Sequence, residues 1–163
     1  MTGKVSIHGL KLSFELVLLK LPAGGDPPAR EVLRRLSAAR INLTCVVLDG
    51  GEPGVAGTCC IDAEDRPLAE RILVQCPGVM AQSETVGTLT VFPHRYQLDL
   101  LAAILRSLVR ENIPLAGIAS SLSALTFILP YKQLDQAAAA VCRVAQLPAN
   151  HAPFRPQFRV KQV

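Results

Sequence analysis

The sequence predicts an α+β protein of two βαββαβ repeats, each with helices on one face of an antiparallel sheet. The main observation is an internal echo: residues 28–43 read PAREVLRRLSAARINL, and residues 100–115 read LLAAILRSLVRENIPL. Ile41 and Ile113 are equivalent at an offset of 72 (113 − 41). Each copy has a helix pattern, a polar residue, Ile-x-Leu and then a strand pattern. A duplication of this length predicts that each copy is one supersecondary unit.

The first repeat has the order of elements that such a unit needs. Asp26, in the turn PAGGDPP, is a candidate N-cap for the first helix, in which Val32, Leu33 and Leu36 share one arc at about 100° per residue. The Gly-rich segment GGEPG then predicts a hairpin connection between two strands. The expected strands and helices are, in order, residues 14–21, 29–39, 42–49, 55–62, 66–76 and 79–83.

The second repeat follows the same order. Its expected strands and helices are residues 88–92, 98–110, 115–121, 123–129 and 131–145, with 158–160 as a candidate last strand. This is the ferredoxin-like order, which places two helices over one antiparallel sheet. We therefore expect domains at 1–84 and 85–163. Residues 4–7 are a candidate extra edge strand.

The helix at 98–110 is apolar over more than half of its circumference, which predicts cover on two sides. One cover is its own sheet, and the other is the first repeat or a second chain. The residues expected at this interface are Leu98, Leu101, Leu105 and Leu108. Charged residues make up only 18% of the chain, below the ~25% of typical soluble domains, which also favours a partner such as a second copy.

The composition narrows the possible functions. Five cysteines have no zinc-site spacing and are expected as buried, reduced thiols, and we expect no metal or cofactor. No apolar run approaches the ~20 residues of a membrane span, and no signal peptide is evident, so we expect a cytoplasmic protein. No nucleophile elbow or converging acid–base pair is evident, so we expect no enzyme activity.

The second repeat contains LTVFP, HRYQ, LDLLAAILRSLVRENIPL and AGIASSLSALTFILP in succession. With this succession it resembles the ACT domain, the small-molecule-sensing module of amino-acid metabolism. Residues 118–127 are especially similar to the paired ACT regulatory region of aspartate kinases, and the resemblance covers about residues 13–147. The loop at 93–97 departs from it because it lacks the usual Gly, and Pro114 stands where the family often has Asn.

The resemblance implies ligand binding at the loop between the first strand and first helix, across an interface between two domains or chains. Unpaired N–H groups at a helix N-terminus suit the carboxylate of an amino acid. The implied ligand-binding residues are Gly24, Gly25, Asp26, Asn42, His94, Arg95, Gln97, Ser120, Ser121 and Ser123. The same residues also fit plain turns and exposed strand positions, and His94, Arg95 and Gln97 could instead block the second loop.

Three functions compete. The first is a stand-alone regulatory module that binds an amino acid, forms a homodimer and acts on a metabolic enzyme. The second is a protein-interaction or dimerisation module without a ligand. The third is nucleic-acid binding, suggested by the net charge of +4 but opposed by the absence of an aromatic ladder, with Phe127 as the main sheet candidate.

Overall fold

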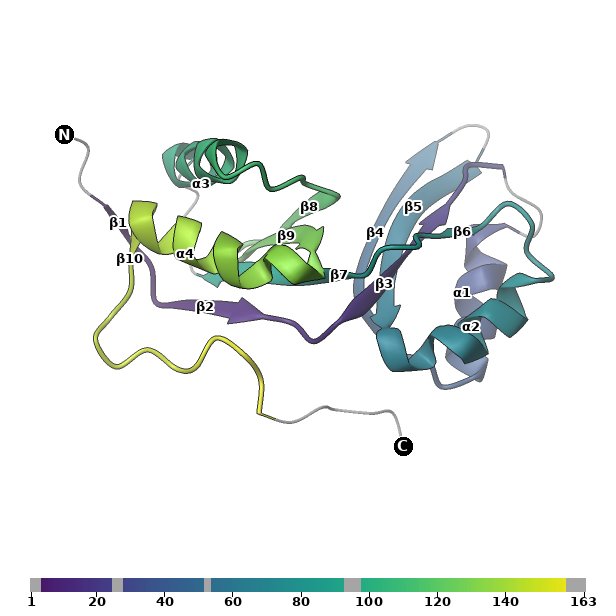
Figure 1. The fold of residues 1–163 in the computed structure, drawn as a ribbon. Coiled ribbons are helices and arrows are strands. Elements are labelled where there is room, and N and C mark those ends of the chain that lie inside the picture. The colour runs from purple at the N-terminus through teal and green to yellow at the C-terminus, as the bar shows by residue number, and fades with distance from the viewer. Residues whose placement is uncertain (1–3, 25–27, 52–53, 93–97, 158–163) are drawn as a thin grey trace. The chain divides into compact units, whose positions relative to one another are not determined.

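The computed structural model describes residues 4–24, 28–51, 54–92 and 98–157 (Figure 1). The chain forms two compact units, each with its own core. The inserted unit is Glu15–Thr85, and the outer unit consists of residues 4–14 together with 86–157. The first repeat is thus inserted in the sequence between two parts of the outer unit.

The inserted unit has the expected βαββαβ order. Its elements are β3 (Leu16–Leu21), α1 (Ala29–Ala38), β4 (Leu43–Gly51), β5 (Gly54–Asp62), a short 3₁₀ helix η1 (Ala63–Asp65), α2 (Arg66–Leu73) and β6 (Met80–Ala81). Strands lie in the order β4-β5-β3-β6, and all neighbours are antiparallel. Asp26, the candidate N-cap, lies outside the described residues, and Pro28 precedes the first turn of α1.

The core of the inserted unit lies between this sheet and its two helices, which occupy one side of it (Figure 1). Alternate residues of β3, namely Val17, Leu19 and Leu21, point to the helices and are fully buried. From α1, Val32 and Leu36 fill the same space. The helical stripe predicted from the sequence is therefore the buried one.

The outer unit repeats this architecture with one change of connectivity. Its elements are β1 (Val5–Ser6), β2 (Gly9–Leu12), β7 (Val86–Phe92), α3 (Leu98–Arg110), β8 (Gly117–Ser120), β9 (Leu125–Pro130), a 3₁₀ helix η2 (Tyr131–Gln133), α4 (Leu134–Val144) and β10 (Ala145–Gln146). The helix predicted at 98–110 has the bounds of α3. The sheet order is β2-β7-β9-β8, with antiparallel neighbours.

The edge of this sheet beside β7 is formed by an N-terminal segment that the repeat pattern did not predict. Gly9–Leu12 pairs with β7, and Leu10 and Leu12 are buried in the core of the outer unit. The candidate last strand at 158–160 lies outside the described residues. The candidate edge strand at 4–7 corresponds to β1, which pairs in parallel with β10 in a separate two-stranded sheet.

Within each unit, hydrogen bonds join the two chain segments that lead to the other unit. On the outer side, the Ser13 N–H donates to the Thr88 carbonyl at 2.9 Å, and the Thr88 N–H donates to Ser13 Oγ at 2.8 Å. On the inserted side, Thr85 Oγ1 donates to Glu15 Oε1 at 2.6 Å. The chain therefore divides differently from the expected 1–84 and 85–163, because residues 4–14 belong with the second repeat.

The duplication is visible in the way the first helix of each repeat ends. Arg40 and Asn112, again 72 residues apart, both adopt left-handed conformations, with φ of 59° and 52°. The N–H of Ile41 donates to the Leu36 carbonyl, and that of Ile113 donates to the Leu108 carbonyl, at 3.1 and 3.0 Å. These bonds form a Schellman motif in both copies, which turns each chain into the next strand.

Of the helices that the structure describes, none combines the length and apolar character needed to cross a membrane.

The pairing of β2 with β7 generates a prediction about Leu10. We expect Leu10→Ala to cost about 2–5 kcal/mol of stability, because a fully buried side chain is truncated. The loss should appear as faster hydrogen exchange in β7 and β9 of the outer unit. Lys11→Ala, on the exposed face of the same strand, is the control. Faster exchange confined to β3 and β5 would contradict the observed pairing.

Candidate functional site

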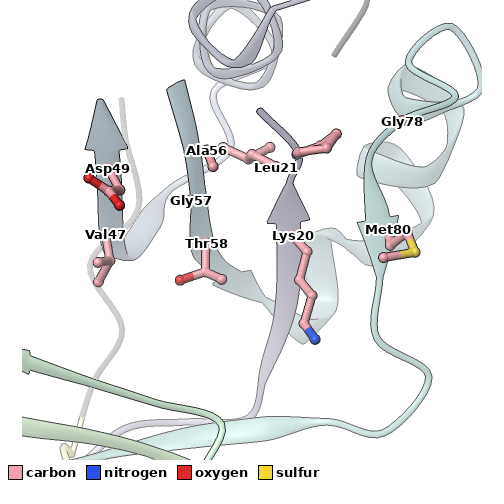
Figure 2. A pocket seen from close by; sticks show the side chains of 10 residues that line it. Lys20, Leu21, Val47, Asp49, Ala56, Gly57, Thr58, Gly78 and Met80 are labelled. Atoms are coloured by element: carbon pink, nitrogen blue, oxygen red, sulfur yellow. The ribbon is translucent and has the colours of Figure 1, made fainter. Parts of the chain in front are cut away.

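The inserted unit has a hollow on the sheet face that its helices do not cover. Because side chains alternate along a strand, Lys20 of β3 points away from the helices, whereas Leu19 and Leu21 point toward them. Lys20 lies opposite Thr58 of β5, which lies opposite Val47 of β4. On the other flank, Lys20 lies opposite Met80 of β6. One row of side chains thus crosses all four strands (Figure 2).

We call this hollow the trough. It has a volume of about 470 Å³. The lining residues are Lys20, Leu21, Pro22, Val47, Asp49, Ala56, Gly57, Thr58, Gly78 and Met80.

Small residues of β5 form the floor of the trough. Ala56, Gly57 and Thr58 succeed one another on this strand, and longer side chains from β4, β3 and β6 stand on either side (Figure 2). At Gly57 a Cβ atom would lie 2.3 Å from the Val47 carbonyl oxygen, so this position excludes any larger residue. Ala56, which lies opposite Asp49 on the open face, is the small side chain of β5 that leaves room for the trough.

Two unpaired charges border this apolar floor. Lys20 and Asp49 are exposed, and neither side chain has a hydrogen bond or ion pair with another described residue. From strand geometry their Cα atoms are about 12 Å apart, since they differ by two strands and two residues. An ammonium group and a carboxylate that flank an apolar surface are suited to a small molecule with both charges.

The loop predicted to bind the ligand starts at one end of the trough. Leu21 and Pro22 line the trough, and Gly24 follows them with a positive φ of 66°, a conformation that favours glycine. Gly25 and Asp26 lie outside the described residues. The helix that the loop enters, α1, carries Glu31 in its first turn.

Glu31 is neutralised by two arginines of its own helix. Arg34 donates two hydrogen bonds of 2.7 Å to it, and Arg35 donates one of 3.0 Å. These bonds, that from Arg34 foremost, lower the pKa of the Glu31 carboxyl from 4.5 to about 2. The first turn of α1 therefore carries no uncompensated negative charge that would repel an anionic group.

The structure does not bring Asn42 close to the trough within this unit. Asn42 precedes Leu43, which lies opposite Ile61 and so at the level of Val17, at the start of β3. The trough and Gly24 lie at the other end of β3, at least four residues or about 13 Å away. A ligand that contacted both ends would have to bind between two copies of the unit.

The remaining predicted ligand residues belong to the second repeat. His94, Arg95 and Gln97 lie outside the described residues. Ser120 ends β8, and Ser121 and Ser123 follow in the turn to β9, all three exposed. Within this turn the Ser121 N–H donates to the Ala124 carbonyl, and the Ala124 N–H donates to Ser121 Oγ, at 2.9 and 3.2 Å. Ser121 thus contributes to the turn itself.

The four leucines predicted at an interface on α3 have different environments. Leu108 is 2% exposed and belongs to the core of the outer unit, so it is not a surface residue. Leu101 and Leu105 are partly buried against that core. Only Leu98 is largely exposed, at 78%. A second partner predicted to cover this helix would therefore bury a smaller apolar surface than the composition of the helix indicated.

Sequence reasoning missed Lys20, Asp49, Thr58 and Met80. Each lies in a strand and carries no motif, and only the strand register places them in one row. Within the described part of the chain, no three His, Cys, Asp or Glu residues are grouped so that they could hold a metal ion. The five cysteines are free thiols in this structure; Cys59, Cys60 and Cys76 are buried, whereas Cys45 and Cys142 are only half-buried, in contrast to the expected burial of all five.

The inserted unit and the outer unit are both ferredoxin-like, and this pair of units defines the class of fold. Comparison with solved structures places the fold more closely. The chain is similar to the ligand-free regulatory subunit of aspartate kinase from Thermus thermophilus, with a TM-score of 0.71 and 15% identity over 86% of this chain and 100% of that chain. The regulatory subunit from Thermus flavus gives 0.69 and 15% over 85% and 98%.

A similar match is found in complete enzymes. The chain matches Escherichia coli aspartokinase III in complex with lysine and aspartate, with a TM-score of 0.63 and 14% identity, over 90% of this chain and 35% of that chain. These comparisons confirm the resemblance to the aspartate kinase regulatory region at the level of the fold. No protein-family model and no curated protein matched the sequence.

The cluster at Glu31 generates a pH prediction. Because its pKa is lower in the folded state, the stabilisation is complete above pH 4.5 and is lost as the pH falls toward 2. We expect Arg34→Gln to raise the Glu31 pKa toward 4.5, as measured by carboxyl carbon NMR chemical shifts. Arg30→Gln on the same helix is the control. An unchanged midpoint in Arg34→Gln would show that Arg34 is not the principal cause.

Proposed function

We propose that this chain is a regulatory module that binds an amino acid in the trough of the inserted unit. The observation that carries the proposal is the pair of unpartnered charges, Lys20 and Asp49, on either side of the apolar floor. Lys20 would attract the ligand carboxylate and Asp49 its ammonium group, while the floor accepts the apolar part. The fold supports this, since regulatory subunits of aspartate kinase share it.

The similar enzyme from E. coli was solved with lysine and aspartate, which makes amino acids the first ligands to test here. Binding would act by population shift, since a ligand favours the arrangement of chains that completes its site. In this proposal the chain has no catalytic role of its own. It would act in the cytoplasm on a metabolic enzyme partner.

We further propose that the binding arrangement is a homodimer. β4 is an edge strand of nine residues, and its outer side has no strand partner among the described residues. Val46 and Leu48 on one face, with Val55 nearby on β5, are between 41% and 47% exposed. A long, apolar edge strand is a template for pairing with another chain. A second copy that paired with β4 would cover these residues.

The same edge favours the second function, an interaction module without a ligand. Nucleic-acid binding has less support, because Phe127, the main aromatic candidate on the sheet, is fully buried in the core of the outer unit.

The ligand proposal predicts thermal stabilisation. A screen of the proteinogenic amino acids should identify one that, at 100 times its dissociation constant, stabilises the folded chain by about 2.7 kcal/mol. Ala56→Leu, which fills the trough, and Asp49→Asn, which removes the carboxylate, should abolish the shift. Ala38→Leu, on an exposed position of α1, is the control for the added bulk. The proposal fails if no amino acid raises the unfolding temperature.

The dimer proposal predicts the molar mass of the protein in solution. The chain should elute at 35 kDa (2 × 17.5 kDa) in light scattering after gel filtration. Leu48→Lys should give folded single chains, because a buried charge would be left unpaired in the interface. Leu122→Lys, at a 77% exposed turn position of the outer unit, should remain dimeric. If Leu48→Lys leaves the mass unchanged, the contact is elsewhere, and Leu98→Arg on α3 tests that alternative.

A further inference from the structure

Two cysteines lie directly opposite each other on the β4–β5 hairpin. Cys45 of β4 and Cys60 of β5 are register partners in the antiparallel ladder. Directly opposed residues in such ladders have Cα atoms about 4.5 or 5.5 Å apart. Disulfide bonds need Cα atoms about 4.4–6.8 Å apart, and both values lie within this range. Both thiols are free in this structure.

A β-bulge creates this pairing. Leu43 lies opposite Ile61, but the next pair is Cys45 with Cys60, so Thr44 is the extra residue of β4. In a regular ladder Thr44 would face Cys60. Cys59 is next to Cys60 in sequence but points to the helix side, where it belongs to the core and lies opposite Val46. The bulge therefore places the Cys45 thiol opposite Cys60 and not opposite Cys59.

The two thiols differ in accessibility, which sets the order of reaction. Cys45 is half-buried on the edge strand, whereas Cys60 is fully buried. Burial raises the pKa of both thiols, and that of Cys60 to about 12, so neither is strongly ionised at neutral pH. A reagent from solution can reach Cys45 first, and Cys60 then meets it across the ladder.

The pair also adjoins the trough. Along the same sheet face, the next opposed pair is Val47 with Thr58, and the one after it is Asp49 with Ala56. All four of these residues line the trough. A disulfide bond between Cys45 and Cys60 would therefore connect β4, which borders the trough, to β5, which forms its floor. The bond would lie one residue pair before the first trough residues on this face.

We propose that Cys45 and Cys60 form a thiol–disulfide exchange site whose substrate is a small-molecule disulfide. The Cys45 thiolate attacks one sulfur of the substrate, which gives a mixed disulfide and releases one thiolate. The Cys60 thiolate then attacks the Cys45 sulfur and releases the second thiolate. Two protein thiols lose two electrons and two protons, and the substrate disulfide is reduced to two thiols, so the reaction balances. This inference does not depend on amino-acid binding.

The test treats the full chain with oxidised glutathione under mildly alkaline conditions, which increase the thiolate fraction of both cysteines. We expect the intact mass to fall by about 2 Da, for two lost hydrogens, and dithiothreitol to restore it. Peptide mapping should identify the Cys45–Cys60 bond. The oxidised chain should unfold at a temperature higher by roughly 10 °C, because the bond restricts the unfolded state.

Variants distinguish this pair from the other cysteines. Cys45→Ser and Cys60→Ala should each abolish the internal bond, and Cys60→Ala should stop at the mixed disulfide on Cys45. Cys59→Ser and Cys142→Ser should oxidise as the unaltered chain does. If Cys60→Ala does not fold, Cys45→Ser at the half-buried edge position still decides the matter. A bond mapped to another pair, or unchanged oxidation of Cys45→Ser, would overturn the proposal.

Discussion

The pairing of β2 with β7 is the constraint on which the architecture depends, because it joins residues 77 positions apart (89 − 12). Closing so long a loop has an entropic cost, but the folded inserted unit reduces it. Its first and last residues, Glu15 and Thr85, are hydrogen-bonded at 2.6 Å, so the effective loop shortens to about 7 residues. From (3/2)RT ln(77/7), the entropic cost falls by about 2 kcal/mol. Folding of the inserted unit therefore favours completion of the outer sheet through the connectivity of the chain.

The local sequence pattern predicted the helices and strands, but it did not predict the non-local pairing of β2 with β7. The helix at 98–110 and the β4–β5 hairpin were predicted from periodicity and turn residues, which act within a few positions. The segment Gly9–Leu12 has only four residues, and nothing in GLKL indicates that its partner is β7 rather than β3. Its one specific feature is Gly9, where a Cβ atom would lie 2.4 Å from the Phe92 ring. That contact is evident only once the pairing is known.

The candidate site shows the same division between local and non-local information. The loop at Gly24 was predicted, since turn residues followed by a helix give a local signal. Asn42 was assigned to the same site through a family resemblance, yet in one unit it lies at the opposite end of β3. The trough was missed because Lys20, Thr58 and Asp49 come from three strands and meet only through register. The left-handed conformation of Arg40 and Asn112 was not predicted, although Asn is common in this conformation at the end of a helix.

One extra residue in β4 determines both the trough and the cysteine pair. A shift of register by one residue exchanges the two faces of a strand. Without the bulge at Thr44, residues 46 and 48 would stand on the open face, and Asp49 would point to the helix side. The trough would then lose its carboxylate, and Cys45 would face Cys59. The charge arrangement proposed for ligand binding and the thiol pair proposed for exchange thus have a common structural cause. Deletion of Thr44, by contrast, would place Cys45 directly after Leu43, so that a regular ladder would keep Cys45 opposite Cys60 and Asp49 opposite Ala56.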